Sequence, residues 1–321
     1  MPNIMKALVE ASNSAGGYLV PTEFSNRLLA LIQNKAVIMG DCDIRSMNAQ
    51  VKYIPTVTAG TTARWVAEVA TITASQTAYS RITLTAKKIA ALTEISTELL
   101  EDNNVDVADT LVDQMGNDIA LAIDLEMIEG TGGHFTGLRD TGSFANAVDA
   151  LGTINETGAD GTDSALTGEQ ITVKAMQAAV GEILKDNHEQ PDVSYWNPKV
   201  LGQLQQLTDS TARPILNMET YGSPLLREGV TATLYGTKAK STSQLGTTYS
   251  YGTTAALGSS SASDAIVARS KMHAIVGQRR GFIWKNDYVM ATDQYQYQTT
   301  MRLAFAIKYP NAYCMIRAIV D

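Results

Sequence analysis

Residues 51–89 read VKYIPTVTAGTTARWVAEVATITASQTAYSRITLTAKKI. Near the end of this stretch, Ile82, Leu84 and Ala86 alternate with polar residues. This period of two predicts a half-buried strand. Between Thr58 and Ser80 the residues are mostly small or polar and surround Trp65. We therefore predict a long β-hairpin. An isolated two-stranded ribbon is only marginally stable and exposes its edges, so we expect this hairpin to lie on another chain.

The composition is that of a globular protein with an acidic surface. The chain has 321 residues, of which 45% are hydrophobic, enough to bury a large core. Its 25 Lys and Arg against 33 Asp and Glu give a net charge of −8, which disfavours general nucleic-acid binding. The sequence contains no apolar run of 18 residues and no secretory signal. These features predict a protein that is not inserted in a membrane and remains in a cytoplasm-like space.

Apolar periodicity predicts further elements on both sides of the hairpin. Gly16–Pro21 reads as an extended arm that leads into a short helix over Glu23–Gln33. Further helices are expected over Val105–Glu129, after a capping box at Thr167 and Gln170, and over Val200–Leu207. Strands are expected over Asp264–Gly277, Gly281–Met290, Tyr295–Lys308 and Ala312–Val320, and a surface loop over Lys238–Ser263. The mixture predicts an α+β fold.

The long predicted helix carries four carboxylates away from its apolar residues, namely Asp113, Asp118, Asp124 and Glu126. Neither a histidine nor a lysine accompanies them in a pattern that would support acid–base catalysis. We interpret all four as a solvated helix face.

The remaining candidates for chemistry favour structural roles. Gly130–Gly133 lacks the Gly-Lys-Ser/Thr ending of a phosphate loop and follows a helix, which predicts a turn. The two cysteines, Cys42 and Cys314, lack CxxC spacing and are expected to be buried thiols. The three histidines are far apart in sequence and are expected on the surface or in loops: His134, His188 and His273.

One basic pair stands out against the acidic composition. Arg279 and Arg280 lie close to Trp284 and Lys285. For so acidic a chain we interpret them as a solvated or inter-subunit patch rather than a nucleic-acid site. The sequence shows no recognisable set of catalytic residues and no cofactor-binding or metal-binding motif. It therefore favours a self-assembling structural protein over an enzyme.

Four motifs resemble the major capsid proteins of tailed bacteriophages with the Hong Kong 97 fold. They are Gly16-Gly17-Tyr18-Leu19-Val20-Pro21-x-Glu23-Phe24, Ala63-x-Trp65-x-x-Glu68-x-Ala70, Leu84-x-x-Lys87 and Ile95-Ser96-x-Glu98-Leu99-Leu100-Glu101-Asp102. Weaker landmarks continue the resemblance to Pro310-x-Ala312-Tyr313, so it covers nearly the whole chain from Gly16.

The resemblance implies a domain organisation. The amino-terminal arm would be residues 1–24 and the extended β-hairpin loop residues 48–90. The peripheral domain would combine residues 91–141 with 276–321 and contain the long predicted helix as the spine helix. The axial domain would be residues 142–275.

The resemblance also implies a function. The chain would be a major capsid protein that self-assembles, as hexamers and pentamers, into the icosahedral shell around the double-stranded DNA genome of a tailed phage. The implied partners are a portal, a decoration protein outside the shell, and packaged DNA without sequence-specific contacts. Since fifteen residues precede Gly16, we expect scaffolding to come from a separate protein or to be dispensable. The expected location is the virion, after assembly in the host cytoplasm.

Two alternatives remain at this point. An encapsulin-type compartment, which encloses cargo enzymes, would share the fold. An enzyme site assembled from distant residues would use side chains such as Trp196, His188 and Asp209.

Four hairpin residues are the candidate inter-subunit contacts. Arg64, Glu68 and Arg81 would form ion pairs with a neighbouring copy, and Trp65 would anchor the hairpin there. Aromatic residues and arginine dominate the energetics of protein interfaces.

Overall fold

The computed structural model describes residues 36–68, 70–98, 107–130, 133–140, 144–151, 154–155, 171–187, 189–206, 217–218, 230–247, 249 and 262–320. The predicted arm and the short helix over Glu23–Gln33 lie outside these residues, as do His188 and Asp209.

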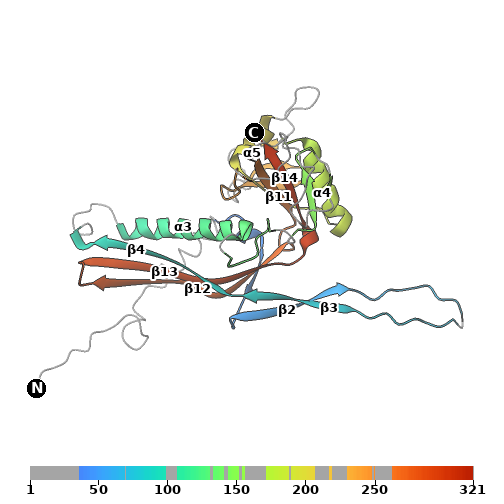
Figure 1. Ribbon diagram of the computed structural model, residues 1–321, viewed down its shortest axis with the longest axis horizontal. Helices are drawn as coiled ribbons and strands as arrows, with labels where there is room; N and C mark the ends of the chain where they lie inside the picture. The colour runs from blue at the N-terminus through green and yellow to red at the C-terminus, as the bar shows by residue number, and fades with distance from the viewer. Residues whose placement is uncertain are drawn as a thin grey trace, which may run out of the picture.

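A long four-stranded sheet with one helix on its face forms one half of the molecule (Figure 1). Its strands, in spatial order, are β1 (Asp43–Ser46), β12 (Ala274–Val289), β13 (Gln294–Ile307) and β4 (Lys87–Ser96), and the helix is α3 (Val107–Glu129). Alternate residues of β13 face α3, so that Met301, Leu303 and Phe305 share one core with helix residues such as Ile119 and Ile123. This confirms the predicted alternation in β13 and the predicted helix end before Gly130, whose φ is +64°.

The hairpin packs on the opposite face of this sheet. Its strands, β2 (Val51–Ala59) and β3 (Ala78–Thr85), are antiparallel, as predicted. At its base, Ile54 and Leu84 pack against Ala304 of β13. The tip, residues 60–68 and 70–77, forms no strand and is almost entirely exposed. The hairpin and the long sheet point to opposite ends of the molecule (Figure 1).

An eight-stranded mixed sheet forms the other half of the molecule. The spatial order is β6 (Ile154–Asn155), β5 (Asn146–Asp149), β14 (Tyr313–Val320), β11 (Ala262–Ala268), β7 (Val193–Trp196), β10 (Thr237–Ser241), β9 (Val230–Leu234) and β8 (Asn217–Met218). Helices α4 (Val173–Asn187) and α5 (Pro198–Gln206) pack against one face in a core that contains Trp196. Residues from the other face, including Tyr195 and Tyr313, belong to the same core as α3, so the two halves share buried apolar surface.

Several predicted elements need correction. The strand predicted over Asp264–Gly277 is two strands, β11 and β12, separated by a turn in which Lys271 has a φ of +60°. Helix α4 begins at Val173, and the amide of Ala175 donates to the hydroxyl of Thr172 at 3.3 Å, so the capping residue is not Thr167. Residues 238–241, predicted as loop, belong to β10.

Candidate functional site

The hairpin tip presents large apolar side chains to solvent. The side chain of Trp65 is fully exposed and that of Ile72 is 79% exposed; Tyr79, on β3 next to the tip, is 72% exposed. Weak polar contacts link the two arms of the tip: the Thr62 amide donates to Ser75 Oγ at 3.0 Å, and Arg64 Nη1 donates to Thr73 Oγ1 at 3.4 Å. A tip with so much exposed apolar surface is typical of a segment that binds another protein.

The four predicted contact residues lie in two places. Arg64, Trp65 and Glu68 are together in the tip, and Glu68 forms no ion pair with any residue that the structure describes. Arg81 lies further back on β3, opposite Pro55, and its guanidinium sits 4.7 Å from the ring centroid of Tyr53. The tip residues can therefore bind one partner surface together, whereas Arg81 already has a cation–π partner within its own hairpin.

A polar junction connects the two sheets at the point where the chain enters β1. The carboxylate of Asp41 accepts hydrogen bonds from the hydroxyl of Tyr195 at 2.9 Å and from Lys240 Nζ at 2.8 and 3.0 Å. Tyr195 is on β7 and Lys240 on β10, both in the eight-stranded sheet, while Asp41 ends the 3-10 helix η2 (Met39–Asp41) just before β1. This ion pair fixes one half of the molecule to the other.

One of the sequence-based interpretations is wrong at this junction, and a second is correct only in part. Asp124, expected on a solvated helix face, is only 1% exposed and accepts the backbone amides of Val37 at 2.8 Å and Ile38 at 3.3 Å. Burial raises the pKa of Asp124 to about 7, although these hydrogen bonds oppose the shift. His273, expected on the surface or in a loop, does lie in the turn before β12, but it is fully buried, and burial lowers its pKa.

The sequence contains a signal for the first of these errors. Asp124 lies one helical turn after Ala120, and its neighbour Ile123 faces the core, which places position 124 at the edge of the buried stripe. His273 offers no comparable signal, because it follows a turn without glycine or proline. The thiol of Cys42 lies 3.9 Å from Nε2 of His273, and burial raises the pKa of this thiol. The prediction of two buried free cysteines, Cys42 and Cys314, is confirmed.

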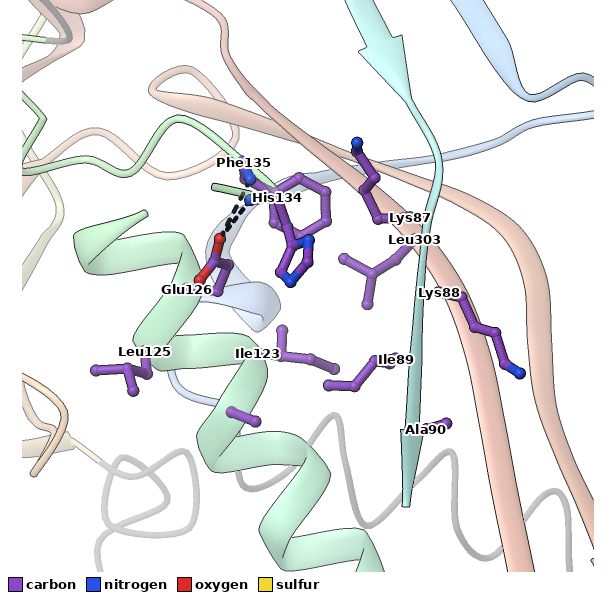
Figure 2. Close-up of a pocket in the computed structure, with 11 residues that line it drawn as sticks. Lys87, Lys88, Ile89, Ala90, Ile123, Leu125, Glu126, His134, Phe135 and Leu303 are labelled. Atoms are coloured by element: carbon purple, nitrogen blue, oxygen red, sulfur yellow. Dashed lines mark hydrogen bonds between the residues drawn. The ribbon is translucent and has the colours of Figure 1, made fainter. Parts of the chain in front are cut away.

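A pocket of about 490 Å³ lies between β4 and α3 (Figure 2). Its wall is mainly apolar, with Ile89 and Phe135 among its lining residues. Glu126 Oε1 accepts the backbone amides of His134 at 2.9 Å and Phe135 at 3.3 Å, which holds the loop after α3 against the helix (Figure 2). The glutamate therefore has a structural role, and the glycine-rich segment is a turn, with Gly133 at a φ of +66°.

The described part of the chain shows neither a clustered metal site nor a membrane-spanning helix. Among these residues, no three His, Cys, Asp or Glu side chains are grouped so that they would hold a metal ion. None of the described helices combines the length and apolar content needed to cross a bilayer.

The model of the phage capsid family matches residues 16–317. The chain belongs to this family. As a phage capsid protein it is a major capsid protein of a tailed phage and a component of the virion, which confirms the function predicted from sequence. The encapsulin alternative is not favoured.

Solved structures with the same fold come from phages and from GTA particles. A capsid structure of an empty GTA particle is 16% identical and has a TM-score of 0.63, covering 98% of this chain and 100% of that one. A structure from Microbacterium phage Oxtober96 is 13% identical with a TM-score of 0.63, covering 89% and 91%. One from Mycobacterium phage Adephagia is 16% identical with a TM-score of 0.61, covering 98% and 99%. No curated protein sequence matches the chain.

Proposed function

We propose that this phage capsid protein forms hexamers and pentamers that close into an icosahedral shell around double-stranded DNA. The observation that carries the proposal is the hairpin tip, whose exposed Trp65 has no packing partner among the described residues. Burying an apolar side chain of this size stabilises the complex in which it is buried. The surface of a second copy of the chain can cover Trp65 in this way.

The geometry supports a contact that repeats from copy to copy. The hairpin and the four-stranded sheet extend in opposite directions from the place where they pack together, so a hairpin that reaches a second copy leaves the sheet of its own copy open to a third (Figure 1). Such a head-to-tail contact produces closed rings when its rotation closes. Rings of five and six are the units that an icosahedral shell requires.

The proposed division of the chain follows the resemblance to Hong Kong 97-type capsid proteins. Residues 48–90 would be the extended loop, and α3 would be the spine helix of a peripheral domain formed by residues 91–141 and 276–321. Residues 142–275 would be the axial domain, and residues 1–24 the arm. The two sheets support this division in part, because the long sheet with α3 and the eight-stranded sheet are distinct layers, but β14, within residues 276–321, belongs to the eight-stranded sheet beside β5 and β11.

The role we propose is structural and not enzymatic. The acidic net charge of −8 suits a container for DNA, because a strongly basic lining would hold the duplex during packaging. Further proposed partners are a separate scaffolding protein, a portal and a decoration protein, and assembly would occur in the host cytoplasm.

Size-exclusion chromatography with light scattering tests the shell. Purified protein should elute as particles of many subunits, and only particles from infected cells should contain double-stranded DNA. A stable monomer near 34.5 kDa under all assembly conditions would contradict the proposal.

A further inference from the structure

Polar side chains gather on the face of the four-stranded sheet that lies opposite α3. Alternate residues of β13 face the helix, as Met301 and Leu303 do. The other residues in this part of the strand therefore project from the opposite face, and they include Gln298, Thr300 and Arg302. The centre of that face thus carries a guanidinium, a hydroxyl and an amide in a line along one strand.

Cations on the two neighbouring strands flank these side chains. Arg302 pairs in register with Lys88 on β4 and with Arg280 on β12, and Gln298 pairs with Lys285 on β12. Residues opposite one another on adjacent strands project from the same face. All of them line one pocket of about 130 Å³. We name it the cationic pocket and define it by Lys88, Arg280, Lys285, Gln298, Thr300 and Arg302.

The cationic pocket has no counter-charge within its own chain. None of its four cations forms an ion pair with another residue that the structure describes. The side chains of Gln298 and Thr300 likewise form no hydrogen bond with a described residue. Like charges directly opposite one another destabilise a sheet, so an anion bound here would remove a repulsion that the isolated subunit contains.

The acidic residues on the same face are further along the sheet and have other partners. Glu94 and Asp287 both lie in register with Gln296. Glu94 accepts a hydrogen bond from Nε2 of Gln296 at 2.7 Å, and Asp287 accepts the backbone amide of Tyr288 at 3.0 Å. Neither carboxylate therefore neutralises the cationic pocket.

The size and the donors of the pocket indicate the class of anion. Its volume of about 130 Å³ is well below the roughly 300–1,000 Å³ of pockets that enclose drug-sized ligands, so it suits a small group. A guanidinium donates two parallel hydrogen bonds to a phosphate, and a lysine ammonium supplies a compact positive charge. A phosphate group also carries enough oxygen atoms to accept hydrogen bonds from several of these side chains at once.

We propose that the cationic pocket binds a phosphate group. Arg302 and Arg280 donate hydrogen bonds to its oxygen atoms, and Lys88 and Lys285 supply the remaining positive charge. The phosphate group is either free inorganic phosphate or part of a nucleic-acid backbone, and the two sources share this chemistry. The inference is independent of the proposed shell, because one folded subunit carries every residue of the pocket.

Titration of the purified full-length protein with inorganic phosphate tests the site. Calorimetry should detect binding, and phosphate should raise the unfolding temperature, because a ligand that binds only the folded state stabilises it. Sodium chloride at the same ionic strength is the control for general screening and should have a much smaller effect. The absence of binding, or an equal rise in unfolding temperature with both salts, would overturn the inference.

Substitutions test the assignment to these residues. Arg302→Gln should weaken phosphate binding about tenfold or more, because it removes a charge-assisted pair of hydrogen bonds. Lys88→Gln, at an exposed position on the edge strand β4, should also weaken binding and provides the test if circular dichroism shows that Arg302→Gln is unfolded. Lys174→Gln, which removes an exposed cation from α4, is the matched control. Equal losses of affinity in Lys174→Gln and the pocket variants would show non-specific binding and overturn the inference.

A short DNA duplex distinguishes the two sources of phosphate. A duplex that displaces inorganic phosphate from the wild type, and binds more weakly to Arg302→Gln, supports the pocket and assigns it to the nucleic-acid backbone. A duplex that leaves phosphate binding unchanged supports the pocket and assigns it to free phosphate. Shells that form from a protein without phosphate affinity would overturn this inference alone and leave the proposed function intact.

Discussion

The hydroxyl of Tyr195 donates a 2.9 Å hydrogen bond to Asp41, and this bond joins the eight-stranded sheet to the segment that enters the four-stranded sheet. Lys240 binds the same carboxylate, with its side chain only 12% exposed and that of Asp41 15% exposed. The rigid relation between the two halves of the subunit thus depends on a nearly buried charge pair as well as on the shared apolar core.

Substitutions of Asp41 and Tyr195 should differ in how much they destabilise the subunit. Asp41→Ala leaves the Lys240 ammonium without its partner, which should destabilise the subunit by about 3–5 kcal/mol. Tyr195→Phe removes a single hydrogen bond and should cost about 1 kcal/mol. Urea unfolding followed by circular dichroism measures both. Equal losses in the two variants would contradict the central role of the charge pair.

Asp124 should make stability depend on pH. Its pKa in the folded protein, about 7, is above the value near 3.9 in an unfolded chain, so the folded state binds the extra proton. The stabilisation is complete at pH below about 3.9 and is lost as pH rises through 7, at about 1.4 kcal/mol for each unit of pKa shift. Asp124→Asn should remove this dependence.

The comparison between Asp124→Asn and the wild type should be made at pH 5 and pH 8. The variant should gain stability relative to the wild type as the pH rises, because the amide cannot ionise. His273 titrates in both proteins, so its contribution cancels in the difference. A difference that is the same at both pH values would show that Asp124 has an ordinary pKa.

The ion pair between Arg139 and Asp264 should contribute strongly to stability. Arg139 Nε lies 2.7 Å from Oδ2 of Asp264, whose side chain is fully buried, and the guanidinium stacks 3.3 Å from the Tyr249 ring centroid. Arg139→Leu should cost about 3–5 kcal/mol because it removes the ion-pair partner of a buried carboxylate, which then keeps its hydrogen bond from the Ala318 amide but no longer the guanidinium at 2.7 Å. In thermal unfolding, Arg139→Leu with Asp264→Asn should be less destabilised than Arg139→Leu alone; a larger loss would contradict this.

Removing the hairpin tip should separate folding from assembly. Replacing residues 61–76 with a short Asn-Gly turn leaves Ile54 and Leu84 packed at the hairpin base, so the subunit should remain folded and soluble. It should not form shells, since the proposed inter-subunit contact is gone. Electron micrographs showing normal shells from this variant would refute the role of the tip.

The shell should be held without covalent cross-links through the tip. An isopeptide bond needs a lysine amine, and from Thr58 to Ser80 the chain has Arg64 but no lysine. Mature particles boiled in detergent should therefore run as one band near 34.5 kDa. A ladder of linked subunits in the wild-type protein would disprove this.

Local patterns predicted the elements whose signals are strong. The alternation in Arg81–Ala86 and in Tyr295–Lys308 gave the correct buried faces, and Gly130 gave the correct end of α3. The break between β11 and β12 escaped prediction because the turn residues 269–273 include no glycine, proline or asparagine. The placement of Lys271 at positive φ depends on tertiary packing that a single sequence does not reveal.

Of the two surfaces that meet in the proposed inter-subunit contact, the sequence predicts only the hairpin tip. Trp65 and Glu68 stand out in a hairpin that is poor in core residues, so one side of the contact could be proposed from sequence. The surface of a neighbouring copy that receives the tip is formed by the fold, in which strand register brings together residues such as Lys88 and Arg302, which are 214 residues apart in sequence. Neither spacing nor composition encodes that register in a readable form.

A cryo-electron microscopy reconstruction of purified particles tests the central claim most directly. The account predicts closed icosahedral shells of pentamers and hexamers in which each hairpin tip contacts a neighbouring subunit and Trp65 is removed from solvent there. Purified protein that remains monomeric, or shells in which the tip contacts its own subunit, would contradict it.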